Sequence, residues 1–402
     1  MDVDYLWFVN AVQVFFLVAL GLSTLYIFLF SFAGLFYRQS SYPIGVKPKK
    51  IAVLIPGYKE DEVIVEVAHD ALAQDYDSRY FDVVIIADSF LPETIVKLRE
   101  LPIKVIEVSF EKSTKSKALN KAMEQLDNSY EIAVVLDADN LMAKDFLTKI
   151  NASFEKDFLA VQGHRMAKNM NTSLAILDAI SEEINNHIFR KGHRVFGLSS
   201  AIIGSGMAFK YQFFKDMMQT VTAVGGFDKE IELKMLKSGY KINYLDDACV
   251  YDEKVQKSEV FSNQRRRWLS AQLHYFRRDF FSSLKDLLLK GNVDYFDKAI
   301  QFIQPPRILL LGALLLFGAS FTFFNFWISN LTVYTILWGA IGGVCILSFL
   351  FSIPRSFYNL KTARALASLP KGMFLMLGSL LKIKGANKKF IHTQHSSTNL
   401  NK

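Results

Sequence analysis

The chain has 402 residues and is 51% hydrophobic, a larger apolar share than an average soluble domain carries. Its formal net charge is +8, yet residues 355–402 hold nine Lys or Arg and no Asp or Glu, which leaves the rest of the chain at −1. Nucleic-acid binding needs basic residues clustered on the binding face, so a balance of −1 outside the tail argues against it. The two cysteines present argue against a disulfide framework and against a zinc site.

Two long apolar stretches predict membrane-spanning helices. Residues 5–37 and 308–354 contain no charged side chain. Because one helix crosses a bilayer in about 20 residues, the first stretch allows one crossing and the second allows two. Asp2 and Asp4 precede the first stretch where a signal peptide would be basic, which favours an uncleaved anchor. Basic residues follow each stretch and predict an inner-membrane or plasma-membrane protein, with the N-terminus outside and the middle and C-terminal tail cytoplasmic, facing membrane lipids.

Strands and helices alternate between the two apolar stretches. This alternation is typical of βαβ units, whose strands form a parallel sheet. We therefore expect a cytoplasmic α/β domain with a mostly parallel sheet and transmembrane helices at both ends. The expected strands are 51–55, 83–87, 103–108, 132–136, 158–166 and 202–209, and the expected helices are 115–126, 173–187, 258–289 and, in the membrane interface, 366–383.

Two acids one residue apart, Asp137 and Asp139, follow the apolar run 132–136. If the strand pleat continues, their side chains point the same way. Open α/β folds bind ligands at the carboxyl ends of their strands, and carboxylate oxygens suit Mg²⁺ or Mn²⁺, which take their remaining ligands from substrate phosphates. The pattern predicts a divalent-cation site, against the alternative of two acids in a solvated loop. A G-x-G-x-x-G fingerprint after the first strand and a P-loop are both absent from the sequence.

Five motifs follow one another along the chain: Ile55–Glu60, Asp88, Lys115–Asn120, Asp137–Asp139 and Gln264–Trp268. In this order they resemble those of the glycosyltransferase family 2 domain. The last looks like the Q-x-x-R-W signature of the membrane-embedded branch, which includes cellulose synthase, hyaluronan synthase and ceramide glucosyltransferase. The resemblance covers about residues 50–275 and implies a Rossmann-like GT-A fold that transfers a sugar, with inversion, from a nucleotide diphosphate sugar, usually a UDP-sugar.

The resemblance also implies roles for the matching residues. Asp139, together with Asp137, would hold the Mn²⁺ or Mg²⁺, and Arg267 would stabilise the leaving diphosphate. A hairpin glycine pair is the plainer interpretation of Gly204 and Gly206, and a helix lying on the membrane surface is the plainer interpretation of the Gln264–Trp268 motif. On the nucleotide side the residues would be Pro56, Tyr58, Glu60, Asp88, Lys115 and Asp137, and on the acceptor side Gly204, Ser205, Gly206, Gln264 and Trp268.

Three acids at the start of a predicted helix, Asp228, Glu230 and Glu232, are candidates for the catalytic base. Inverting transfer needs a carboxylate that accepts the proton of the acceptor hydroxyl. Counting back from Gly239 puts the family's catalytic Asp on Asp228, with Glu230 as the alternative, although Phe227 stands where the family has Glu. At a helix start Asp is also a favoured N-cap, and the two roles are compatible.

The acceptor stays open at this point. The chain could extend a polysaccharide, glycosylate a lipid or lipid-linked acceptor once, or serve as a degenerate nucleotide-sugar-binding scaffold in an export complex. Three spans are few for a polymer channel, which a second copy or an export partner could complete. The expected division is 1–49 anchor and basic flank, 50–257 transferase domain, 258–305 amphipathic helices with Q-x-x-R-W, 306–354 two spans, and 355–402 basic tail.

Overall fold

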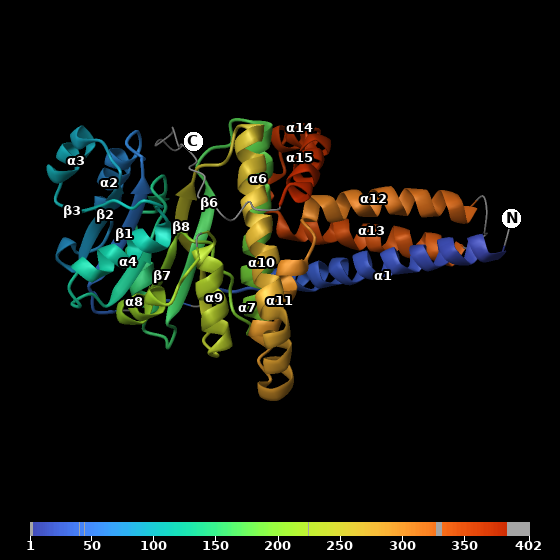
Figure 1. Cartoon of the computed structure of the whole chain (residues 1–402), viewed down its shortest axis with the longest axis horizontal. Coiled ribbons are helices and arrows are strands. Elements are labelled where there is room, and N and C mark those ends of the chain that lie inside the picture. The colour runs from blue at the N-terminus through green and yellow to red at the C-terminus, as the bar shows by residue number, and fades with distance from the viewer. Residues whose placement is uncertain (1–2, 40, 44, 224, 327–331, 384–402) are drawn as a thin grey trace.

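The computed structural model describes residues 3–39, 41–43, 45–223, 225–326 and 332–383, so part of the predicted basic tail lies outside the described residues. An α/β domain forms one end of the molecule and long apolar helices extend from the other end (Figure 1). Between them run α6 (Ser173–Asn186) and α10 (Ser258–Lys290), which cross the direction of the long helices.

Eight strands form one mixed sheet: β1 (Ile51–Tyr58), β2 (Phe81–Asp88), β3 (Lys104–Val108), β4 (Ile132–Val135), β5 (Leu141–Met142), β6 (Ala160–Ala167), β7 (Met207–Lys210) and β8 (Ile242–Asp252). Their order is β3-β2-β1-β4-β7-β6-β8-β5. The predicted parallel pairing is confirmed for β1 to β4, and β6 runs parallel to β8. β7 is antiparallel to β4 and β6, and β5 is antiparallel to β8.

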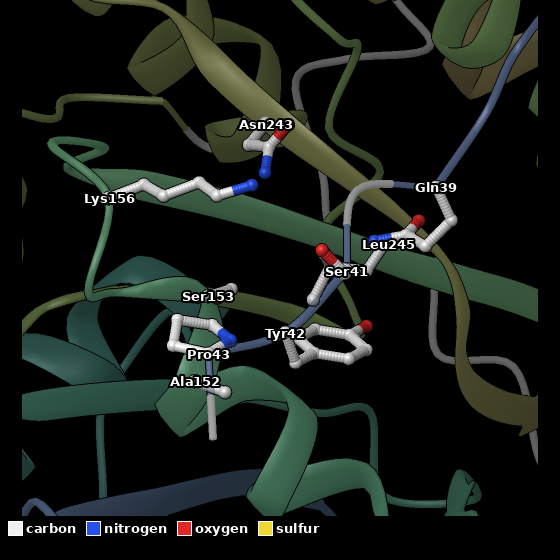
Figure 2. A pocket seen from close by; sticks show the side chains of 9 residues that line it. All are labelled: Gln39, Ser41, Tyr42, Pro43, Ala152, Ser153, Lys156, Asn243 and Leu245. Atoms are coloured by element: carbon white, nitrogen blue, oxygen red, sulfur yellow. The ribbon is translucent and has the colours of Figure 1, made fainter. Parts of the chain in front are cut away.

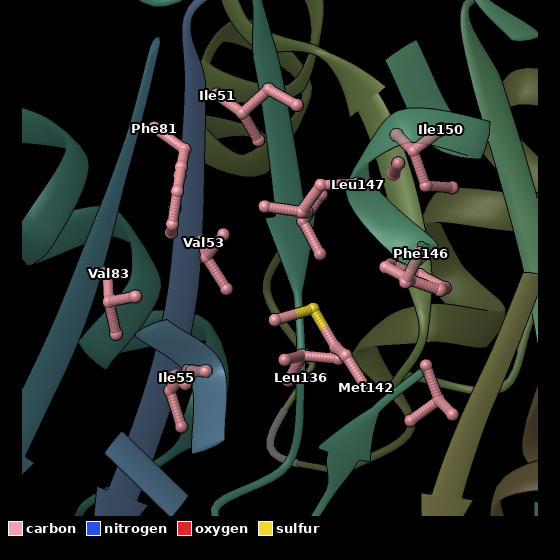
Figure 3. Close-up of a cluster of buried hydrophobic side chains, with 14 of the residues drawn as sticks. Ile51, Val53, Ile55, Phe81, Val83, Leu136, Met142, Phe146, Leu147 and Ile150 are labelled. Atoms are coloured by element: carbon pink, nitrogen blue, oxygen red, sulfur yellow. The ribbon is translucent and has the colours of Figure 1, made fainter. Parts of the chain in front are cut away.

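Helices cover both faces of this sheet, which is therefore buried on both sides. Along β1, Ile51, Val53 and Ile55 belong to the core shown in Figure 3, whereas Ala52 and Leu54 belong to the core of the other face. Because side chains alternate along a strand, a continuous apolar run is what a strand covered on both sides requires. The first face is covered by α2 (Ile64–Leu72), α3 (Pro92–Arg99) and α5 (Phe146–Ser153), and the second by α4 (Lys115–Gln125), α8 (Tyr211–Gln219) and α9 (Phe227–Lys237).

Three helices are long and apolar enough to cross a membrane: α1 (Val3–Gly34), α12 (Arg307–Phe324) and α13 (Thr332–Ser352). α1 lies beside α13, where Ser31 Oγ donates to Ser348 O over 2.5 Å. Apolar side chains such as Trp7 and Phe323 stay largely exposed on these helices, as expected of surfaces that face lipid. By contrast, α15 (Leu369–Leu381) is about 20 Å long and too short to cross the hydrocarbon core.

The C-terminal end of α1 packs against a π-helix that continues α6, η2 (His187–Gly192). A Cβ on Gly192 would come within 2.1 Å of the carbonyl oxygen of Phe30. The next residue, His193, begins α7 (His193–Val195), is fully buried and stacks on the Phe30 ring at 3.7 Å. His193 also lies 3.1 Å from Asp297 of α11 (Val293–Ile303). Contacts around His193 therefore connect α1, η2 and α11.

A buried histidine on β6 makes stability sensitive to alkaline pH. His164 lies 2.9 Å from Asp246 and 3.2 Å from Glu183. Burial alone would lower the pKa of His164, but these two carboxylates outweigh it and raise the pKa to about 9. Because the folded pKa exceeds the unfolded value near 6.5, this contribution is fully present below about pH 6.5 and is lost as pH rises through about 9.

We therefore expect the detergent-solubilised protein to lose on the order of 2–3 kcal/mol of stability between about pH 6.5 and 9.5 through His164. Thermal unfolding followed across this range checks it. The His164→Gln variant, which cannot gain a proton, should be less stable at pH 6.5 and nearly insensitive to the change. A variant that keeps the wild-type pH slope would show that another group is responsible.

Candidate active site

The carboxyl ends of β1, β2 and β4 meet at one edge of the sheet. Tyr58 and Asp88 end β1 and β2 and are paired in the parallel register. Lys59, the next residue, donates its N–H to Asp88 O over 3.1 Å. A Cβ on Gly57 would lie 3.6 Å from the Cβ of Ala138, the middle residue of the D-x-D motif. The structure thus brings together nucleotide-side residues that the sequence places on three separate strands.

The backbone is strained where β1 and β2 end. Lys59 and Ser89 have φ angles of 55° and 60°, which non-glycine residues rarely adopt. Such conformations cost about 1 kcal/mol or more each and gather at ligand sites. Of the other predicted nucleotide-side residues, Pro56 is half-buried within β1 and Glu60 is buried just beyond its end.

The two acids of the D-x-D motif lie in different surroundings. The regular strand ends at Val135, and a turn follows in which Asn140 donates its N–H to Asp137 O over 3.1 Å. The strand pleat therefore does not continue through the motif, and the expectation that Asp137 and Asp139 point the same way, which depended on that pleat, does not hold. The Asp137 side chain is 38% exposed, whereas Asp139 is 2% exposed and accepts hydrogen bonds from Asn140 Nδ2 and the backbone N–H of Glu253, at 3.1 and 3.2 Å.

Lys115 links the D-x-D motif to the predicted acceptor turn. It is the first residue of α4, whose N-cap Thr114 accepts a hydrogen bond from a backbone N–H of the first turn. The Lys115 ammonium pairs with Asp137 Oδ1 at 2.5 Å and donates to Gly204 O over 2.8 Å. It also lies 5.5 Å from the centre of the Phe227 ring. One side chain therefore contacts the nucleotide-side acid, the turn and the start of α9.

The turn at residues 204–206 is built into the same network. Gly204 has φ of 79°, a conformation that favours glycine, and a Cβ there would lie 3.6 Å from Asp228 Cγ. Ser205 Oγ accepts from the N–H of Asp137 over 2.9 Å and donates to Asn140 Oδ1, and its side chain is fully buried. Gly206 O accepts from a backbone N–H of β6. Gly204 is thus the residue of this turn that lies against Asp228.

Asp228 lies in the first turn of α9, and the alternative interpretation, in which it is the N-cap of this helix, is wrong. The N-cap is Gly226, which has a left-handed φ of 72°, so Phe227 and Asp228 are the first two helical residues. A carboxylate in the first turn is still favoured by the helix dipole. The Asp228 side chain is 8% exposed, and Lys229 Nζ lies 3.7 Å away. Because Gly226 is the N-cap, the Asp228 carboxylate is not needed to cap α9 and can act beside Gly204.

The other two candidate bases are engaged elsewhere. Glu230 is buried, accepts from the N–H of Ala223 over 2.9 Å and pairs with Lys234 at 3.0 Å. Glu232 is 1% exposed, pairs with Lys298 at 2.8 Å, and has its pKa raised by burial. These contacts stabilise the start of α9 and its packing on α11, which argues against a role for either acid as the base.

α10 approaches the start of α9 one turn beyond Arg267. A Cβ on Gly226 would lie 3.4 Å from the Cβ of Ala271, and Tyr275 donates its hydroxyl to Gly226 O over 3.3 Å. Arg267 is half-buried, and burial lowers the pKa of its guanidinium, which remains charged at neutral pH. The Q-x-x-R-W helix therefore packs against the element that carries Asp228.

The aromatic residue of the Q-x-x-R-W motif is partly covered by its own helix. The Arg265 guanidinium lies 4.4 Å from the centre of the Trp268 ring and pairs with Asp178 of α6. One of the two ring faces available for a sugar is therefore occupied. Gln264 Oε1 is buried and lacks a hydrogen-bond donor within the ranges that the structure describes, so it can accept one from a ligand.

The sequence analysis did not predict a cluster of polar side chains that lies behind the D-x-D motif. Asn140 Nδ2 donates to Asp252 Oδ1 over 3.1 Å, and Lys254 Nζ donates to Asp252 Oδ2 over 2.8 Å. Arg165 of β6 lies 3.8 Å from Asp252 and pairs with Glu182 of α6 at 2.8 Å. These residues come from four separate stretches, so spacing gives no signal. The position of Asn140 beside the D-x-D motif is the one hint in the sequence.

The donor set at the D-x-D motif fits a hard divalent cation. Asp137 is the reachable carboxylate, while Asp139 lies behind it with its oxygens oriented by two N–H donors. Within the part of the chain that the structure describes, no three His, Cys, Asp or Glu side chains are grouped to hold a metal. The remaining ligands would come from substrate oxygens and water, as is usual for Mg²⁺.

A small pocket lies near the amino end of β8, away from this edge (Figure 2). Its volume is about 10 Å³, room for one water molecule and not for a sugar. Its lining contains none of the predicted site residues. The lining residues are Gln39, Ser41, Tyr42, Pro43, Ala152, Ser153, Lys156, Asn243 and Leu245.

Comparisons with known proteins agree with this fold. Residues 48–271 match the family described as glycosyltransferase like family 2. A poly-beta-1,6-N-acetyl-D-glucosamine synthase of Staphylococcus aureus (strain COL) is 24% identical over 287 residues, 68% of this chain and 69% of the relative. The synthase of the same name from strain MSSA476 matches to the same extent. Mannosyltransferase PcManGT from Pyrobaculum calidifontis, in complex with GDP-Man and Mn²⁺, gives a TM-score of 0.53 at 17% identity, covering 85% of this chain and 98% of that chain.

The structural likeness, at this identity, shows the fold alone, and it confirms the predicted GT-A-like α/β architecture with a mostly parallel sheet. The family match spans more than half of the chain and contains the strand ends, the D-x-D motif, the turn at 204–206 and the Q-x-x-R-W motif. The chain belongs to glycosyltransferase like family 2 and is a glycosyltransferase.

Proposed function

We propose that this chain is a membrane-bound, inverting polysaccharide synthase that moves a sugar from a UDP-sugar to a hydroxyl of a growing glycan. The observation that carries the proposal is the arrangement around Gly204. Lys115 reaches from Asp137 to the Gly204 carbonyl, and Asp228 lies against the same glycine. A donor held at Asp137 and an acceptor held at Asp228 would therefore meet within one turn of the chain.

The strand ends would hold the nucleotide. Tyr58 and Asp88 sit side by side in register, flanked by Pro56 and Glu60, and would contact the base and ribose. Asp137 would lie toward the diphosphate, with Lys115 beside it. A divalent cation, Mn²⁺ or Mg²⁺, held by Asp137 and Asp139 would supply charge neutralisation for the departing diphosphate.

Transfer itself would need a base on the acceptor side and positive charge on the donor side. Asp228 would take the proton of the acceptor hydroxyl as its oxygen bonds to the anomeric carbon, while the bond from that carbon to the phosphate oxygen breaks. Arg267 would stabilise the negative charge that develops on the diphosphate. Gly204, Ser205 and Gly206 would shape the acceptor side, with Gln264 and Trp268 contributing from α10.

A growing polysaccharide is the acceptor that the comparisons favour. The two S. aureus relatives are named as synthases of a polysaccharide, poly-beta-1,6-N-acetyl-D-glucosamine, and they match over two thirds of their length. We extend that reaction class, without its particular sugar, to this chain. An export partner or a second copy would complete the path for the polymer, since the described residues contain three candidate spans.

We further propose the orientation and division expected from the sequence. The N-terminus would be outside, and the transferase domain at 50–257 and the tail at 355–402 would be cytoplasmic. Basic residues after α1 and α13 support this orientation. The amphipathic region at 258–305, with the anchor at 1–49 and the spans at 306–354, would place the Q-x-x-R-W motif at the membrane surface.

A donor panel tests the proposed function. The purified full-length protein, in detergent with membrane lipids, is incubated with UDP- and GDP-sugars and Mn²⁺, and both nucleotide diphosphate release and product length are measured. We expect metal-dependent release from one UDP-sugar and products many sugars long. The Asp139→Ala variant should lose most of this activity because the cation loses a ligand.

Two outcomes would contradict the proposal in different ways. A lipid product carrying a single sugar would identify a lipid glycosyltransferase. Nucleotide-sugar binding without turnover, unchanged in the Asp228→Asn variant, would identify a scaffold.

A further inference from the structure

The cation nearest to the D-x-D motif is one that the protein itself supplies. The Lys115 ammonium is 2.5 Å from Asp137 Oδ1, one of the two oxygens that this carboxylate could offer a metal ion. Both side chains are partly shielded, 20% and 38% exposed, so the pairing is less screened than one on the open surface. Lys115 thus occupies the reachable carboxylate of the motif.

The position of Lys115 runs against the local preference of its helix. It is the first residue of α4, where the helix dipole disfavours a positive charge. Asp137 and the Gly204 carbonyl offset this cost by accepting from the ammonium. A residue that breaks a local rule while a specific partner compensates is expected at functional sites.

Phe227 carries no negative charge that could neutralise Lys115, so Asp137 is the carboxylate that pairs with it. The Phe227 ring lies 5.5 Å from the ammonium and offers only a weak cation–π contact. In this chain the carboxylate that neutralises Lys115 is therefore the one expected to bind the metal.

We propose that Lys115 is a built-in competitor of the divalent cation for Asp137, so that the metal binds tightly only together with the nucleotide diphosphate. This inference rests on the proposed function. Asp139 cannot replace Asp137 in the free protein, because it is buried and its oxygens accept two N–H donors. When a diphosphate arrives, its oxygens offer Lys115 a new anionic partner and supply the ligands that the metal lacks.

Direct Mn²⁺ binding tests this without requiring sugar transfer. Free Mn²⁺ is measured by electron paramagnetic resonance in titrations of the full-length detergent-solubilised protein, with and without UDP. We expect the nucleotide-free Lys115→Met variant to bind Mn²⁺ about tenfold or more tightly than wild type. The reason is that the Lys115 ammonium and a Mn²⁺ ion at the same Asp137 carboxylate would repel each other strongly, even when solvated. Lys115→Gln should behave alike, and Lys115→Arg, which keeps the charge, should stay near wild type.

Controls separate this site from other sites and from the proposed function. The gain in the Lys115→Met variant should disappear when Asp137→Asn is added. Equal or weaker nucleotide-free affinity in both Lys115→Met and Lys115→Gln, while wild type still binds Mn²⁺ with UDP, would overturn this inference alone. If wild type and the variants bind no Mn²⁺ even with UDP, both the competition and the metal dependence of the proposed function fail.

Discussion

Sugar transfer by the Asp228→Asn variant is expected to fall by about 10²–10⁴-fold, the usual contribution of a general base. The amide has nearly the shape of the carboxylate and can remain against Gly204, but it cannot accept the acceptor proton. Affinity for UDP should stay close to wild type, because the proposed role of Asp228 is on the acceptor side. Steady-state transfer rates and calorimetric UDP titrations measure the two effects separately.

Glu230→Gln is the matched control, since both acids lie in the first turn of α9. Glu230 anchors the loop before α9 through backbone N–H groups, so its loss should lower stability by about 1–3 kcal/mol while turnover per folded molecule is kept. The reverse pattern, with normal transfer in Asp228→Asn and loss of turnover in a folded Glu230→Gln, would make Glu230 the base.

The Gly192→Ala variant is expected to show the largest loss of stability, about 3 kcal/mol or more. The added Cβ would meet the carbonyl oxygen of Phe30 at 2.1 Å, and that atom belongs to the backbone of α1, which cannot rotate away. The α1 helix would have to separate from η2, taking His193 off the Phe30 ring. The thermal unfolding midpoint and the amount of protein recovered from membranes report the change.

Gly342→Ala in α13 provides the control for this packing. Among the residues that the structure describes, and apart from the neighbouring backbone of α13 itself, no heavy atom lies within 4 Å of a Cβ built there, so alanine should be neutral or stabilise by up to about 1 kcal/mol through helix propensity. If the two variants unfold at the same temperature, α1 is not packed on the π-helix as the structure describes.

The sequence predicted the first strands of the sheet best. β1, β2 and β4 are continuous apolar runs, and such runs carry a strong strand signal. β8 was not expected, because its register on β6 shifts between Gly163 and His164, and Asp246 and Asp247 fall in the irregular stretch. A strand that bulges around charged residues loses the pattern by which strands are identified.

The sequence predicted which residues form the candidate site better than how they are connected. Motif order was enough to select Asp88, Asp137 and Lys115 from a resemblance, and counting back from Gly239 selected Asp228. The contact from Lys115 to Gly204 joins residues 89 positions apart, and that from Asn140 to Asp252 joins residues 112 positions apart. Such contacts depend on the tertiary fold. The incorrect N-cap assignment has a local cause, since Gly226 with its left-handed φ caps α9, which begins at Phe227, one residue before Asp228.

A structure of the full-length protein in lipid nanodiscs with UDP and Mn²⁺ tests the central claim most directly. We expect UDP along the carboxyl ends of β1, β2 and β4, with its base beside Tyr58 and Asp88, and its diphosphate between Asp137 and Gly204. The Asp228 carboxylate should face the free end of the diphosphate across Gly204. UDP bound at another surface, or a diphosphate remote from both Asp137 and Asp228, would contradict the site described for this chain.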